Sequence, residues 1–145
     1  MGASDVIAII ALIISVVTAT CQIIHERRQN TTNLNAYYFN EIYRDYLIHK
    51  IPNARKYISI NQHGKLIGCQ DMINEMKNIQ SDSLYYKYTD GEYFSQLSKA
   101  AQGLEDFLIM SSGDTYAGEE VTDFMIKLQN LISKLYKVVN EKYIK

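Results

Sequence analysis

The chain has 145 residues, of which 47% are hydrophobic and 21% are charged, so it has room for a single globular domain at most. Its 15 Lys and Arg nearly balance its 16 Asp and Glu, which argues against a generally basic nucleic-acid binder and against an acidic disordered tail. Two Cys exclude a disulfide scaffold, and one Pro with seven Gly favours long helices over a strand-rich fold.

Residues 6–24 form an uncharged apolar stretch, VIAIIALIISVVTATCQII. As a helix, these 19 residues would reach about 28 Å, close to the thickness of a bilayer core. The preceding MGASD has no basic residue, which is atypical of a cleaved secretory signal, so we expect an uncleaved span. All 15 basic residues follow it, and the positive-inside rule predicts an N-terminus outside and a cytoplasmic C-terminal domain.

The small and polar residues of this predicted span recur at heptad spacing along one face. Such a line lets helices approach closely or exchange hydrogen bonds, and in a ring of copies it could face a narrow lumen. We therefore expect a homo-oligomer above a dimer, with this line directed towards other copies or a pore. The same residue types are also common in solitary anchors, in which case the register has no function. The residues are Ser4, Ala8, Ala11, Ser15, Thr18 and Gln22, continued by His25 and Gln29.

We place the domain boundary after residue 29, and expect residues 30–145 to form an antiparallel helical bundle. The polar QNTTNLN at 29–35 predicts a short linker or a helix restart capped by Thr31 or Thr32. A first bundle helix should follow, with Leu34, Tyr38, Ile42 and Tyr46 at helical spacing, and should stop before Pro52.

Further helices follow from the same periodicity. After a turn at NQHG (61–64), apolar residues from Met72 to Ile79 predict a helix that ends at SDS (81–83). Those from Tyr93 to Leu108 predict a longer helix that ends at SSG (111–113). The last helix has the most regular pattern, at Val121, Phe124, Leu128, Leu131, Leu135 and Val138. The fold class is therefore all-α, with one N-terminal transmembrane helix and a cytoplasmic bundle of four or five helices.

Charge is segregated along this predicted bundle. Residues 44–65 hold five basic and one acidic side chain, residues 71–123 hold three and eleven, and residues 127–145 hold five and one. Opposite-sign blocks favour contacts between copies, although they could equally be the solvated faces of one bundle. The 12 Tyr fall mainly at core-facing spacing, which favours packing over base stacking.

One sequence motif contains residues suited to catalysis. No His, Cys or acid has a recognisable metal-ligand spacing, there is no glycine-rich phosphate loop, and we expect no metal, no cofactor and no small-molecule substrate. The remaining candidate is Arg44-Asp45-Tyr46-Leu47-Ile48-His49, an RxxxxH hexapeptide. Its Arg could hold a phosphate and its His could move a proton during attack by a ribose 2′-hydroxyl.

This hexapeptide, with Asp45 after the Arg, resembles the signature of the HEPN superfamily, all-helical domains in which Arg and His commonly form an RNase site. Together with the predicted span, it makes the chain similar to the membrane-anchored HEPN-like accessory proteins of type VI-B CRISPR systems. That resemblance implies a bacterial inner-membrane protein of antiphage defence, with an RNA-guided RNase or RNA as a partner. On a regular helix, however, Arg44 and His49 lie about 140° apart, which argues against a joint active site.

Three functions remain open. The first is an oligomeric membrane effector that forms a pore or pore-like assembly, with Arg44 and His49 at subunit contacts or in RNA sensing. The second is a membrane-tethered HEPN ribonuclease, with His49 as acid/base and Arg44 as phosphate clamp. The third is a non-catalytic anchor that recruits a partner protein.

Overall fold

The computed structural model describes residues 3–144, and of these the side chains at 3–14, 31, 35, 143 and 144 lie outside the description. The described chain is mostly helical, as the all-α prediction requires, with one two-stranded antiparallel hairpin. Its elements are α1 (Ala3–Asn40), the π-helix η1 (Glu41–Lys50), α2 (Ile51–Tyr57), β1 (Ser59–Ile60), β2 (Leu66–Ile67), α3 (Cys69–Asp82), α4 (Leu84–Thr89), α5 (Gly91–Ser111) and α6 (Glu119–Ile144).

Contacts divide the chain into two units, Met1–Phe39 and Asn40–Lys145. The predicted linker at 29–35 is wrong, because α1 runs through it as one helix. The Thr32 hydroxyl donates a hydrogen bond to the Arg28 carbonyl one turn earlier (2.8 Å), so it lies inside the helix and does not cap a new one.

In α1, the described apolar side chains of the predicted span are exposed. Val16, Val17, Ile23 and Ile24 each keep 50–59% of their surface accessible. Of the predicted stripe, Ser4, Ala8 and Ala11 lie outside the described side chains, whereas Ser15, Thr18 and Gln22 are described and exposed. Among the residues that the structure describes, no helix combines the length and hydropathy needed to cross a membrane.

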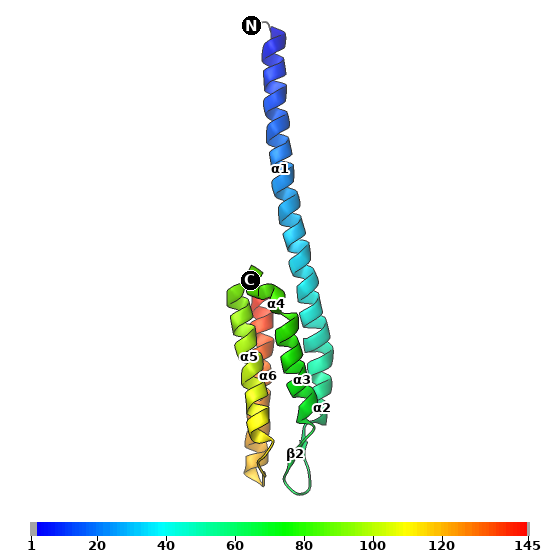
Figure 1. Cartoon of the computed structure of the whole chain (residues 1–145), viewed down its shortest axis with the longest axis vertical. Coiled ribbons are helices and arrows are strands. Elements are labelled where there is room, and N and C mark those ends of the chain that lie inside the picture. The colour runs from blue at the N-terminus through cyan, green and yellow to red at the C-terminus, as the bar shows by residue number, and fades with distance from the viewer. Residues whose placement is uncertain (1–2, 145) are drawn as a thin grey trace. The chain divides into compact units, whose positions relative to one another are not determined.

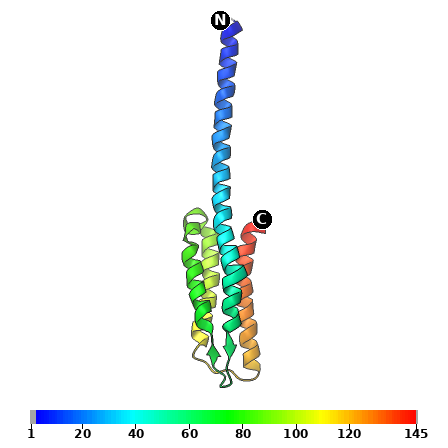
Figure 2. The same cartoon turned by 90° about the vertical axis from the view of Figure 1, so that its right-hand side faces the viewer.

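The second unit is a helical bundle, in which α5 packs against α3, α4 and α6, and α3 packs against η1 and α2. Figures 1 and 2 both show α3, α5 and α6 running side by side. The predicted helices at 72–79, 93–108 and 121–138 are confirmed as parts of α3, α5 and α6. The short α4 was not foreseen. The largest fully buried side chains are Tyr46, Tyr86, Ile42, Ile51, Met72, Met76, Ile79, Leu97, Leu104, Leu108, Leu128 and Leu135.

The first bundle helix differs from its prediction at both ends. Leu34 and Tyr37 are 51% and 64% exposed, so the buried face begins only at Ile42. Pro52 does not stop the helical path either, because α2 begins at Ile51 with the proline in its first turn. The fixed φ of proline suits the first turn of a helix, although proline has no amide hydrogen to donate to the preceding turn.

A turn at 61–64 is confirmed, and it connects β1 to β2. Gly68 precedes α3 with a φ of +76°, and a Cβ there would lie 1.9 Å from the Tyr57 carbonyl oxygen. Only glycine avoids that clash. Gly64 accepts a hydrogen bond from the Tyr116 amide (2.8 Å), which ties the hairpin to the loop between α5 and α6. Figure 2 shows the hairpin and this loop at the same end of the bundle.

Candidate functional site

The RxxxxH motif lies entirely within η1, whose amides bond to carbonyls five residues earlier instead of four. The last bond of this register runs from the Ile51 amide to the Tyr46 carbonyl. Ile42, Tyr46 and Leu47 form the buried face of η1, which packs against α3. The Tyr46 hydroxyl donates a hydrogen bond to the Asp82 carboxylate, and burial followed by this acid raises the pKa of Tyr46.

The π-helical geometry of η1 changes the angle between the Arg44 and His49 side chains around the helix axis. Residues five apart lie about one turn from each other in a π-helix, so the two side chains share a face that a regular α-helix would separate. Both are exposed. Within the part of the chain that the structure describes, neither side chain has a hydrogen bond or an ion pair, so both are accessible to a partner outside the chain.

The other basic residues near the motif do not gather around it. Lys50 lies over the ring of Tyr46, with 4.1 Å from its nitrogen to the ring centroid. Lys56 donates to the Asn53 side chain (3.2 Å), and Arg55 turns towards α6. The phosphate-binding charge that the motif offers is therefore that of Arg44 itself.

Pro52 explains why a side chain of α6 donates a hydrogen bond to the backbone of η1 at this point. In the i→i+5 register, the Leu47 carbonyl would accept from the amide of residue 52, but proline has no N–H. The Tyr136 hydroxyl of α6 donates to the Leu47 carbonyl instead. Burial, then the nearby Tyr43, raises the pKa of Tyr136, so its proton stays available for this bond. Nothing in the periodicity of either helix indicated this pairing.

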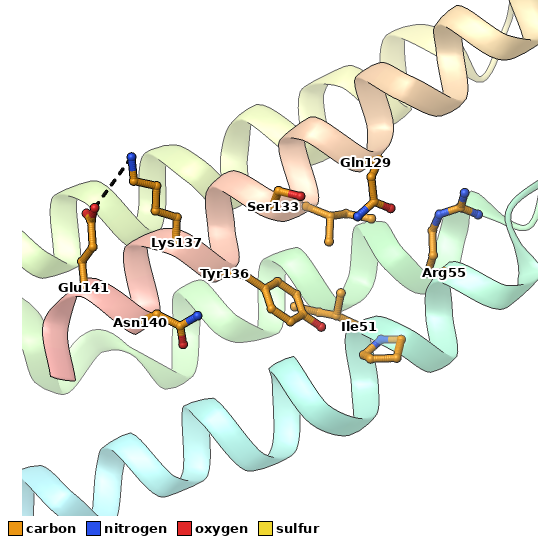
Figure 3. Close-up of a pocket in the computed structure, with 10 residues that line it drawn as sticks. Ile51, Arg55, Gln129, Ser133, Tyr136, Lys137, Asn140 and Glu141 are labelled. Atoms are coloured by element: carbon orange, nitrogen blue, oxygen red, sulfur yellow. Dashed lines mark ion pairs between the residues drawn. The ribbon is translucent and has the colours of Figure 1, made fainter. Parts of the chain in front are cut away.

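A groove lies between α2 and α6, beside this bond. It has a volume of about 710 Å³, and its lining is mainly apolar. Figure 3 shows the Tyr136 ring reaching from α6 towards Ile51, and Arg55 on α2 at one end, with Gln129 on α6 nearby. Sequence reasoning counted Arg55 only as part of a basic block and missed the groove. The lining residues are Ile51, Pro52, Arg55, Gln129, Ile132, Ser133, Tyr136, Lys137, Asn140 and Glu141.

The polar face of α1 is also hollowed. A shallow groove is lined by Thr18, Cys21, Gln22, His25, Glu26 and Gln29, several of which belong to the predicted stripe. The side chains of His25 and Gln29 hydrogen-bond to each other (3.0 Å). Polar side chains along one line of a helix can exchange hydrogen bonds with a neighbouring helix.

Titratable clusters elsewhere are structural. Among the described residues, no group of three or more His, Cys, Asp or Glu is placed to hold a metal ion. Glu105 pairs with Lys77 (3.8 Å), while burial raises the pKa of the Cys69 thiol and reduces its reactivity.

Comparison of the chain with known protein families, with curated proteins and with solved structures found no match.

Proposed function

We propose that this chain is a membrane-bound effector that assembles with its own copies through α1 and holds the bundle of residues 40–145 in the bacterial cytoplasm. The observation that carries the proposal is the exposed apolar surface of α1 at Val16, Val17, Ile23 and Ile24. No charged residue lies between Val6 and Ile24. Such a surface is unfavourable in water and is accommodated by lipid tails or by another apolar helix.

Assembly above a dimer is supported by the line of Ser15, Thr18 and Gln22, which the predicted heptad extends back through Ala11, Ala8 and Ser4. In hydrocarbon, contacts between such residues on neighbouring helices contribute about 0.6 to 2 kcal/mol each. A ring of copies with this line inward would form a pore or pore-like assembly that perturbs the inner membrane. The antiphage role rests on the HEPN resemblance of Arg44, Asp45 and His49.

The test compares two faces of α1 in liposomes loaded with a fluorescent dye. Replacing Ser15, Thr18 and Gln22 together by Leu should change dye or ion leakage, because the polar line is lost. The matched variant carries Leu at Ile9, Ile13 and Val16, on the opposite face, and should leak like the unaltered chain. Equal effects of both variants would contradict the proposal.

Copy number gives a second, independent measurement. Mass determination of the detergent-solubilised chain should find an oligomer larger than a dimer, and the Ser15, Thr18 and Gln22 variant should shift it towards monomer. A monomeric unaltered chain would contradict assembly and leave the third function, a tethered bundle that recruits a partner protein.

A second candidate, a membrane-tethered HEPN-type ribonuclease, is favoured by one observation: η1 is wide enough for Arg44 and His49 to share an exposed face. On that face Arg44 could clamp a phosphate and His49 could serve as acid and base. The purified chain should then cleave single-stranded RNA, His49→Ala should abolish cleavage, and assembly should be unchanged. Absence of cleavage by the unaltered chain would remove this candidate.

A further inference from the structure

The groove between α2 and α6 contains a positive charge, Arg55, that has no carboxylate partner among the residues that the structure describes. Arg55 is half-buried, and its guanidinium makes two long contacts: 3.4 Å from Nη1 to the Ile58 carbonyl and 3.5 Å from Nη2 to the Met125 sulfur. The first is longer than a typical N–H···O bond of about 2.7–3.2 Å, and the second has a thioether sulfur, a weak acceptor, so both contacts are weak. Among the described residues, no acid pairs with Arg55. A partly desolvated guanidinium in this state favours an external anion.

The size and the lining of the groove indicate which other chemical group the bound anion should contain. Its volume of about 710 Å³ lies within the usual range for sites that bind small ligands, about 300–1,000 Å³. Ile51 and Ile132 are 1% and 6% exposed, so they are deep in the lining. The bond from Tyr136 to the Leu47 carbonyl holds the tyrosine in place beside them. The apolar chain of a ligand would therefore pack against side chains that are already ordered, which lowers the entropy cost of binding.

The charges around the groove favour a single negative charge on the ligand. Lys137 and Glu141 at the opposite end pair with each other (3.7 Å; Figure 3), so their charges largely cancel. That leaves Arg55 as the net charge among the lining residues. A phosphate dianion would leave one charge uncompensated, whereas a carboxylate matches the guanidinium in charge and in two-pronged geometry.

We propose that the groove between α2 and α6 binds a monocarboxylic acid with an apolar chain, with its carboxylate on Arg55 and its chain against Ile51, Ile132 and Tyr136. The inference does not depend on assembly of α1, because every group that it uses lies between residues 47 and 141. The ligand class is that of a medium- or long-chain fatty acid.

The test uses the full chain in phosphatidylcholine nanodiscs and a decanoic acid that carries a photoreactive diazirine at the end of its chain. After illumination, peptide mass spectrometry should locate the adducts on the segments that contain Ile51 and Ile132. Unlabelled decanoate should compete, while decanol, which has the same chain and no charge, should compete at least about tenfold more weakly.

Variants separate the site from the fold. Arg55→Gln should reduce labelling of the groove about tenfold or more, while Lys56→Gln, a neighbouring exposed cation, should leave it unchanged. Ser133→Trp should block labelling by filling the groove, whereas Asn130→Trp, on α6 outside the lining, should not. Circular dichroism of each variant checks that the bundle is folded, and Ser133→Trp keeps the test decisive if Arg55→Gln is unstable.

Three results would overturn the proposal: adducts that map only outside the groove, equal competition by decanol and decanoate, or groove labelling that survives both Arg55→Gln and Ser133→Trp.

Discussion

The two units of the chain use apolar residues in opposite ways. In the bundle, Leu97, Leu104 and Leu128 are fully buried, since α3, α5 and α6 cover one another. In α1, Val16 and Ile23 remain more than half exposed. Burial within the chain stabilises the bundle by itself, whereas the surface of α1 gains stability only from lipid or from another chain.

Four hydroxyl side chains illustrate the same difference between the two units. Thr20 and Thr32 of α1 donate to carbonyls of their own helix, four residues earlier. In the bundle, Tyr46 and Tyr136 instead bond across elements, 36 and 89 residues along the chain. These two tyrosine hydroxyls therefore help to specify the tertiary structure of the bundle, while the two threonine hydroxyls of α1 are satisfied locally and leave its surface open to partners.

The largest expected effect tests this contrast directly. Leu104→Ala should lower the free energy of unfolding of the bundle by about 3 kcal/mol, because it leaves a cavity in a fully buried position. Val17→Ala removes apolar atoms from exposed α1 and should change bundle unfolding by less than about 0.5 kcal/mol. Urea titration followed by tyrosine fluorescence measures both. Similar losses for the two variants would mean that the units are not separate in stability.

A smaller effect should come from the bond between α6 and η1. Tyr136→Phe leaves the Leu47 carbonyl without the donor that Pro52 cannot supply, and should cost about 1 to 2 kcal/mol in the same titration. Tyr88→Phe is the matched control, because Tyr88 is 84% exposed, and it should be neutral. If Tyr136→Phe is equally neutral, water or another group replaces the hydroxyl and the bond does not fasten α6.

The smallest effect concerns the N-terminus of α5. The hydrogen bond from Lys142, supported by the amide of Tyr93, lowers the pKa of Asp90 below its ordinary 3.8 despite partial burial. A lowered pKa in the folded state means that the ionised carboxylate stabilises the bundle above about pH 4, and that this contribution is lost as the pH falls through the folded pKa.

Asp90→Asn should therefore reduce bundle stability by about 0.5 to 1 kcal/mol at pH 7, since the amide can still cap the helix but cannot pair with Lys142. The difference from the unaltered chain should disappear in strong acid. Thermal melts at pH 7, 5, 4 and 2.5 measure it, and a gap that widens on acidification would contradict the assignment. Gln102→Glu, on the exposed surface of α5 and about three turns along the helix from Asp90, gives a charge control away from the cap.

Periodicity placed the long helices because it is a local signal: Leu128 and Leu135 are buried where the spacing of the last helix requires. The predicted apolar face of this helix also included Ile132 and Val139, but the pattern did not show which of its residues are most buried: Ile132 and Val139 are buried while Leu131 and Val138 are only half-buried. The packing against α5 selects among apolar neighbours that a pattern treats alike. The pattern also began the bundle too early, at Leu34, because aromatic and apolar spacing continues along the exposed end of α1.

The features of the candidate sites also divide into those that neighbouring residues determine and those that the folded structure determines. The sequence by itself determined the helical class, the uncharged segment at 6–24, the turn at 61–64 and the RxxxxH motif, because each depends on neighbouring residues alone. The three-dimensional structure decided that the π-helical register of η1 brings Arg44 and His49 to one face, that Tyr136 replaces the donor missing at Pro52, and that Arg55 lies in a groove where no acid among the described residues pairs with it. The last two features depend on how η1 and α2 meet α6, a helix that begins more than 60 residues further along the chain, and no local spacing encodes that relation.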